Sequence, residues 1–141
     1  MQAVTFIINS PSCQMNRLDF LGHLLLRFLD QGASCFCLAA DQSYTDFLDD
    51  YLWSDQFALL PHSQSRPTNT LRQVYLGTDL AQAAGCSYVF NCTNQALTTL
   101  PSDMTVETIE WVSNIPSEKT MMRTIFKDYQ SQKITPHTVR M

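Results

Sequence analysis

The sequence predicts a three-layer α/β domain built around a mainly parallel β-sheet. Short β-branched, apolar segments alternate along the chain with longer segments in which apolar residues recur at helical spacing. This alternation favours parallel strands joined by helices. The chain has 141 residues, 45% of them hydrophobic and 16% charged. That length and composition are typical of a single globular domain that buries one core.

The first part of the chain contains two predicted strands and the helix between them. Residues 4–8 and 34–39 are apolar and rich in strand-forming side chains, which predicts two buried strands. Between them, leucines recur every three or four residues from position 16 or 17 to Asp30, and Gly32 then supplies a stop. Cys35 and Cys37 would point to the same face of the second strand, where they can pack as free thiols.

A second helix is predicted to begin after a cap at Asp41 or Ser43 and to end near Leu52. Spacing alone leaves open whether this helix continues through Trp53. If it does, the indole lies among three aspartates on the side away from the core, and otherwise it can fold back. Five residues are expected to form the core face: Tyr44, Phe47, Leu48, Tyr51 and Leu52.

The second half of the chain adds strands and a final helix. Residues 62–69 are expected to form a polar loop, and Pro116 should open a helix that runs to about Tyr129. We expect one domain over residues 1–133 and a frayed tail over residues 134–141. Four further strands are predicted, the last of them as an edge or final strand: residues 57–60, 72–76, 87–91 and 104–112.

Charge and composition restrict the possible functions. The net charge is −4, but residues 1–110 hold 4 Lys/Arg against 11 Asp/Glu, whereas residues 111–141 hold 5 against 2. An acidic body with a basic end argues against more than weak direct DNA binding and permits a local site for an anionic partner. No apolar run reaches the roughly 20 residues of a membrane span, and the N-terminus lacks a signal-peptide pattern. We therefore expect a cytoplasmic protein.

The sequence contains no persuasive catalytic or metal site. The loop after the first strand, NSPSCQMNR, lacks both Gly-x-Gly-x-x-Gly and Gly-Lys-Ser/Thr, so we expect a Rossmann-like or P-loop-like topology without a nucleotide-binding loop. The three histidines and five cysteines show no metal-ligand spacing, and no cofactor or metal is expected. The alternative interpretation is a small enzyme acting on a nucleotide or phosphoester through Cys13, Arg17 and His62.

The predicted last helix carries a cationic stripe. At about 100° per residue, Lys119, Arg123 and Lys127 fall within about 80° of one another, and Phe126 lies at the edge of this stripe. Such a surface can bind an acidic peptide that has an apolar anchor, because arginine can bind a carboxylate with two hydrogen bonds while lysines add charge. The competing interpretation is an ordinary solvated basic face.

Two segments resemble the chi subunit of bacterial DNA polymerase III holoenzyme. The first is FLDDYLWSDQFALLPH, with Leu-Trp, a gap, Phe and then Pro-His. The second is the last helix, with the pattern Lys-x3-Arg-x2-aromatic-Lys-x-Tyr. The resemblance implies a non-catalytic accessory of the clamp loader. Its implied partners are the psi subunit, or an accessory helicase in its place, and the acidic tail of single-stranded-DNA-binding protein, which ends in an Ile-Pro-Phe carboxylate.

The resemblance also assigns residues to these partners. Phe126 stands where the family usually has an aromatic hydroxyl, so any hydrogen bond from that position is lost. The residues implied to bind the tail are Trp53, Lys119, Arg123, Phe126 and Lys127. Those implied to bind psi or a helicase are Phe57, Leu60, Pro61 and His62.

Overall fold

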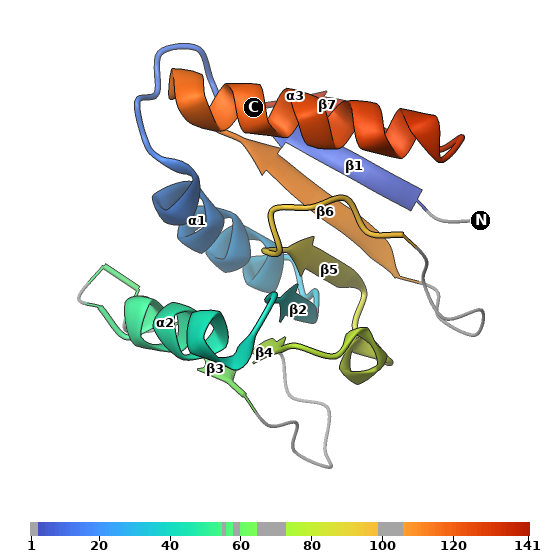
Figure 1. Cartoon of the computed structure of the whole chain (residues 1–141). Coiled ribbons are helices and arrows are strands. Elements are labelled where there is room, and N and C mark those ends of the chain that lie inside the picture. Colours follow the sequence, from blue (N-terminus) through green and yellow to red (C-terminus); the bar gives the residue numbers. More distant parts are fainter. Residues whose placement is uncertain (1–2, 55, 58–59, 65–72, 99–105) are drawn as a thin grey trace.

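The described residues form one seven-stranded sheet in which all pairings are parallel, as the sequence predicts (Figure 1). The computed structural model describes residues 3–54, 56–57, 60–64, 73–98 and 106–141. The strand order across the sheet is β3-β4-β2-β5-β6-β1-β7. The strands are β1 (Ala3–Ile8), β2 (Cys35–Leu38), β3 (His62–Ser63), β4 (Val74–Gly77), β5 (Tyr88–Asn91), β6 (Glu107–Val112) and β7 (His137–Arg140).

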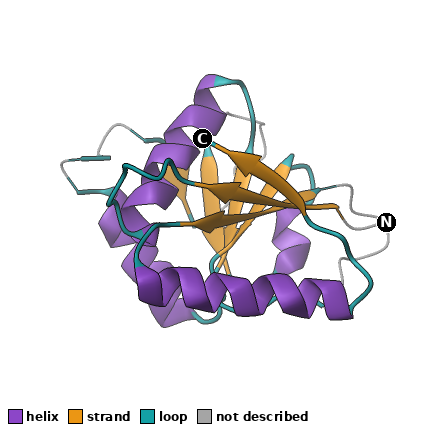
Figure 2. Ribbon diagram, turned by 90° about the horizontal axis from the view of Figure 1, so that it is seen from above, coloured by secondary structure: helices purple, strands orange, loops and turns teal. Residues whose placement is uncertain are grey.

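Helices cover both faces of the sheet, which gives the three predicted layers (Figure 2). Helices α1 and α2 pack on one face, and α3 packs on the other with the short 3-10 helix η1. The helix starts follow local signals: the Asn16 side chain accepts the Asp19 N–H, the Asp41 side chain accepts the Tyr44 N–H, and Pro116 opens α3. The helices are α1 (Arg17–Asp30), α2 (Gln42–Leu52), η1 (Leu80–Ala83) and α3 (Pro116–Ser131).

Each face of the sheet has its own apolar core. On the α1 and α2 side, Leu25 and Leu48 are fully buried, and Cys35 and Cys37 point from β2 toward that side, as predicted. On the α3 side, Ile125 is buried against β1 and its neighbours. All five cysteines are free thiols. Strands in the middle of the sheet are buried on both faces. Their sequences are therefore continuous apolar runs rather than alternations of apolar and polar residues.

A buried polar cluster lies under α3. The Glu110 carboxyl on β6 is fully buried, and its Oε2 accepts hydrogen bonds from Asn91 Nδ2 (2.6 Å) and the Tyr129 hydroxyl (2.6 Å). That hydroxyl in turn accepts the Leu97 N–H at 3.1 Å. Burial raises the pKa of Glu110 from 4.5 to about 7, against the opposing effect of its two donors and of Arg17. Glu110 is therefore a carboxyl that the fold holds largely protonated below neutral pH.

Three predictions about the second half of the chain are wrong. Strand β6 is not an edge or final strand, because it lies between β5 and β1. Residues 137–140 are not frayed, because they form β7 and pair in parallel with β1, which would otherwise be the edge of the sheet. His62 and Ser63 belong to β3 rather than to a loop, because they pair with Val74 and Tyr75. Residues 65–72 of the predicted loop and strand lie outside the described residues.

Two predictions about α2 and the segment that follows it are also corrected. Phe47 does not belong to the core face: it is 49% exposed and stacks on Tyr44 with ring centroids 5.6 Å apart. Phe57 and Leu60 lie in a turn and a bend rather than in a strand, and residues 58–59 between them are not described.

No helix within the described ranges combines the length and the apolar character that a membrane crossing requires.

Candidate functional site

A cavity of about 330 Å³, here called the α3 cavity, lies between α3, the carboxyl end of β1 and β7. Its apolar part includes the buried side chains of Phe6, Val112 and Met122. Three cationic side chains, Lys119, Arg123 and Arg140, also line it, and both arginines are exposed. The other lining residues are Ile8, Asn9, Pro11, Asn114, Phe126 and Thr138.

The charges of the α3 cavity have no ion-pair partner among the described residues. In the described part of the chain, no carboxylate lies within ion-pair distance of Lys119, Arg123 or Arg140. Phe126, by contrast, is fixed: its ring packs edge-on against Phe6 with centroids 5.0 Å apart, and it is half-buried. The arrangement therefore offers free positive charge beside a preformed apolar surface, which suits an anionic ligand with an apolar end.

The structure brings three of the five predicted tail-binding residues together and adds one. Lys119, Arg123 and Phe126 all line the α3 cavity. Lys127 is exposed on the same helix but does not line it. Sequence reasoning misses Arg140, because it predicts a frayed tail over residues 134–141. The alternation in His-Thr-Val-Arg is the signal that would have indicated a strand whose last residue reaches the same cavity.

Trp53 does not lie with the cationic stripe, so the structure does not bring it together with the other predicted tail-binding residues. It follows α2, which packs on the opposite face of the sheet from α3. Helix α2 also contacts β3 and β4 at one edge of the sheet, whereas α3 covers β6 and its neighbours near the other edge (Figure 1). A seven-stranded sheet thus separates the indole from Arg123. The helix ends at Leu52, yet the Trp53 ring does not fold back into the core and is 57% exposed.

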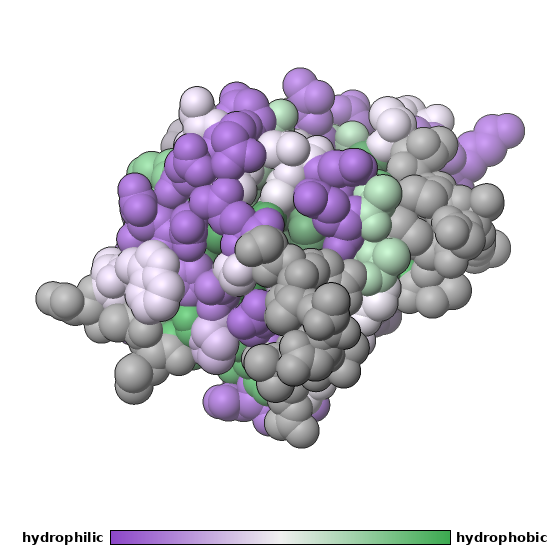
Figure 3. Space-filling view, turned by 90° about the horizontal axis from the view of Figure 1, so that it is seen from below, coloured by the Kyte–Doolittle hydropathy of each residue, from purple (hydrophilic) through white to green (hydrophobic). Residues whose placement is uncertain are grey.

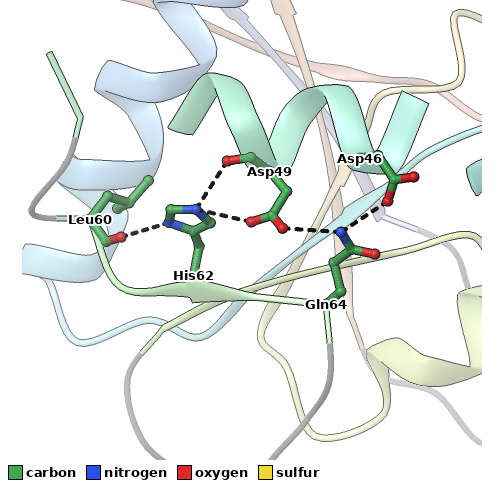
Figure 4. A network of polar contacts seen from close by, with 5 residues as sticks. All are labelled: Asp46, Asp49, Leu60, His62 and Gln64. Atoms are coloured by element: carbon green, nitrogen blue, oxygen red, sulfur yellow. Dashed lines mark hydrogen bonds and ion pairs between the residues drawn. The ribbon is translucent and has the colours of Figure 1, made fainter. Parts of the chain in front are cut away.

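Trp53 instead packs on the histidine of β3. The Trp53 and His62 rings lie 4.5 Å apart between centroids. His62 is held in place from both ring nitrogens: Nδ1 lies 2.8 Å from the Leu60 carbonyl oxygen, and Nε2 lies 3.1 Å from Asp49 Oδ1 (Figure 4). Gln64 extends this network, because its Nε2 donates to Asp49 Oδ2 and to Asp46 Oδ1 (Figure 4). These contacts hold the His62 ring in place, and the exposed Trp53 indole packs against that ring.

The predicted psi-binding residues divide into buried and exposed ones. Phe57 and Leu60 are each only 1% exposed, so their side chains offer almost no surface to a partner in this structure. Phe57 fills the space that Gly22 leaves on α1, since a Cβ at Gly22 would lie 2.3 Å from the Phe57 ring. Pro61 is exposed, and His62 is buried under Trp53. The side of the molecule that carries α2 is mainly hydrophilic, with small hydrophobic areas only (Figure 3).

The residues of the enzymatic alternative do not converge. Cys13 and Arg17 follow β1, whereas His62 lies on β3 at the far edge of the sheet. The strands β4, β2, β5 and β6 lie between β3 and β1. Arg17 is buried and hydrogen-bonded to the Trp111 carbonyl oxygen through Nε at 2.9 Å. Among the described residues no group of His, Cys, Asp or Glu side chains is arranged to hold a metal ion.

Comparison with known proteins identifies the family. A family model described as "DNA polymerase III chi subunit, HolC" matches residues 1–137, which is nearly the whole chain. The chain belongs to the DNA polymerase III chi subunit family. The match ends at residue 137, which is the first residue of β7. A search of curated proteins finds no match.

Membership of the chi family confirms the resemblance drawn from FLDDYLWSDQFALLPH and from the last helix. Chi subunits are accessory components of DNA polymerase III, which places this chain in DNA replication.

Proposed function

We propose that this chain is a non-catalytic adaptor of the clamp loader that binds the acidic C-terminal tail of single-stranded-DNA-binding protein. The observation that carries the proposal is the α3 cavity, in which three unpaired cationic side chains surround an apolar surface. Membership of the chi family supports a place for the chain in the polymerase III assembly.

The charges of the α3 cavity suit a tail that is acidic along its length and ends in a free carboxylate. Arg123 is the expected partner of that carboxylate, because a guanidinium can donate two parallel hydrogen bonds to it. Arg140 supplies a second guanidinium beside the same cavity. Lys119 and Lys127 are expected to attract the aspartates that precede the tail's last residues. Since much of this attraction is exposed charge, the affinity should fall as salt is added.

The apolar surface suits the end of the tail. The Phe6 and Phe126 rings already pack edge-on, and Met122 is buried beside them. A cavity of about 330 Å³ is near the lower end of the range for small-ligand sites, roughly 300–1,000 Å³. It can therefore take the last one or two apolar side chains of a peptide, while the acidic residues stay on the exposed surface of α3.

Calorimetric titration with a synthetic acidic peptide ending in Ile-Pro-Phe tests this assignment. Arg123→Ala should weaken binding at least ~tenfold, equivalent to ~1.4 kcal/mol. Amidating the peptide's C-terminus should weaken binding to the unmodified protein by a similar factor, because it removes the carboxylate charge. If Arg123 contacts that carboxylate, the two changes together should cost less than their sum.

The matched control is Arg27→Ala, which removes an equally exposed arginine from α1 on the opposite face of the sheet. It should leave the affinity for the peptide unchanged. Equal losses from Arg27→Ala and Arg123→Ala, or an amidated peptide that binds as well as the free acid, would contradict the assigned site.

We further propose that the psi subunit, or an accessory helicase in its place, docks on the surface formed by Trp53 and Pro61. Trp53 is the most exposed large hydrophobic side chain among the described residues, and tryptophan is a favoured interface anchor. His62 supports its ring from below, and the buried side chains of Phe57 and Leu60 hold the backbone that presents Pro61.

Co-purification of the tagged chain with psi tests this second surface. Trp53→Ala should lower the amount of psi recovered at least ~tenfold. Phe47→Ala is the control, because it removes an aromatic ring of similar exposure, 49%, from α2, the helix that Trp53 directly follows. Should both variants recover psi equally well, psi docks elsewhere.

A further inference from the structure

A second cavity, here called the Arg17 cavity, lies at the carboxyl ends of β1 and β6. It has a volume of about 390 Å³ and shares no lining residue with the α3 cavity. Its lining residues are Arg17, Leu18, Leu21, Tyr44, Cys92, Asn94, Trp111, Ser117, Glu118 and Met121.

The topology explains why a cavity forms at this point. Strands β1 and β6 are neighbours in the sheet. The chain leaves β1 toward α1 on one face and leaves β6 toward α3 on the other, so the two connections diverge and leave a crevice between them. In open α/β sheets, ligands bind at crevices of this kind, at the carboxyl ends of the strands. The starts of α1 and α3 both contribute lining residues.

The crevice contains a buried cation that no described carboxylate contacts directly, although Glu110 and Glu118 are near enough to stabilise its charge. Arg17 is 8% exposed, and its guanidinium lies over the Trp111 ring, 4.4 Å from the centroid. Its Nε donates to the Trp111 carbonyl oxygen at 2.9 Å and its Nη1 to Asn94 Oδ1 at 3.2 Å. Within the described part of the chain, Nη2 has no hydrogen-bond partner and no carboxylate lies within ion-pair distance of Arg17. A buried charge in this state is costly unless something pairs with it.

The remaining polar groups define what else a ligand needs. Glu118 also lines the cavity, and its Oε1 accepts both the Arg17 backbone N–H (2.8 Å) and the Ser113 hydroxyl (2.6 Å). Its carboxylate would repel a bare anion but can accept a hydrogen bond from a ligand. Leu18, Leu21 and Met121 supply apolar surface. Burial lowers the pKa of Arg17, which reflects the same cost of an unpaired charge.

We propose that the Arg17 cavity binds a small organic oxyanion, a phosphate or carboxylate, whose anionic group pairs with Arg17 and whose attached donor hydrogen-bonds to Glu118. The anion supplies the direct partner that Arg17 Nη2 lacks among the described residues. The rest of the ligand lies against the apolar residues. The site is independent of the proposed tail-binding site, since the two cavities have no residue in common.

Tryptophan fluorescence gives a direct test. The chain has two tryptophans, so Trp53→Phe leaves Trp111, under the Arg17 guanidinium, as the single reporter. This protein is titrated with adenosine monophosphate, glutamate and inorganic phosphate, each at constant ionic strength. A saturable change in emission with adenosine monophosphate identifies a phosphate ligand, and one with glutamate identifies a carboxylate ligand. Inorganic phosphate, which has no donor-bearing body, should bind at least ~tenfold more weakly than the better of the two.

Variants tie the signal to the cavity. Arg17→Met should weaken the response at least ~tenfold, whereas Arg123→Ala in the α3 cavity should leave it unchanged. Because Arg17→Met also removes structural contacts, Ser117→Phe serves as a second variant: Ser117 is exposed at the start of α3, and a phenyl ring there fills the cavity mouth without touching the Arg17 hydrogen bonds. No saturable response to any of the three probes at millimolar concentration, or a response that both variants retain, overturns the proposal.

Discussion

The buried carboxyl of Glu110 should make the stability of this domain fall as the pH rises toward neutrality. Its pKa is about 7 in the folded protein, against 4.5 when it is exposed. Between these two values the folded state keeps a proton that the unfolded state has released. Folding is therefore favoured most below about pH 4.5, and this contribution is lost as the pH rises through about 7. At about 1.4 kcal/mol for each tenfold change, the full loss is about 3 kcal/mol.

Glu110→Gln isolates this contribution. Glutamine has nearly the same shape and does not titrate, and its Oε1 can accept the hydrogen bonds that Asn91 Nδ2 and the Tyr129 hydroxyl now donate to Glu110. The Glu110 oxygen that has no partner, Oε1, would be replaced by an amide nitrogen. The variant should therefore gain stability relative to the wild type as the pH rises, by about 3 kcal/mol in total.

The assay is urea unfolding at several pH values between about 5 and about 8 at constant ionic strength, a window that spans most of the titration. The quantity of interest is the difference in unfolding free energy between variant and wild type, because the other acidic groups titrate equally in both. This difference should grow with pH. A difference that stays constant across the window would refute the reasoning, since it would mean that Glu110 is already ionised in the folded protein.

Three further predictions concern stability and the separation of the two surfaces. Leu48→Ala should cost about 2–5 kcal/mol of unfolding free energy in urea, because Leu48 is fully buried, whereas Phe47→Ala beside it should cost under about 1 kcal/mol. Asn16→Ala should cost about 0.5–2 kcal/mol in the same assay, because it removes the acceptor for the Asp19 N–H at the start of α1, and an unchanged transition would argue against that cap. Trp53→Ala should leave the calorimetric affinity for the acidic peptide unchanged, and a loss like that of Arg123→Ala would contradict the separation of the two surfaces.

The parts of the fold that depend on local signals could be predicted from the sequence. The parallel sheet follows from the alternation of apolar strands with helices, and the helix starts follow from the caps at Asn16 and Asp41 and from Pro116. Strand order depends on the whole fold and not on local sequence. The alternating pattern of residues 104–112 therefore predicts an edge or final strand, whereas β6 lies between β5 and β1. Strand β7 is short and exposed, and it exists because β1 offers it an unpaired edge.

The candidate sites were predictable to a smaller extent, for the same reason. The stripe of Lys119 and Arg123 lies on one helix, so helical periodicity was enough to find it. Arg140 joins them only through the pairing of β7 with β1. The resemblance to the chi family assigns Trp53 to the same site as Lys119 and Arg123. In the structure, Trp53 lies near the other edge of the sheet and on its other face. The burial of Phe57 depends on a gap at Gly22, which no linear pattern reveals.

The placement of α2 and α3 on opposite faces and toward opposite edges of the sheet means that neither surface is covered when the other is occupied. A peptide lying along α3 leaves Trp53 open to solvent, and a protein docked at Trp53 leaves Arg123 accessible. One domain of this size can therefore bind two different partners at the same time, without competition between them.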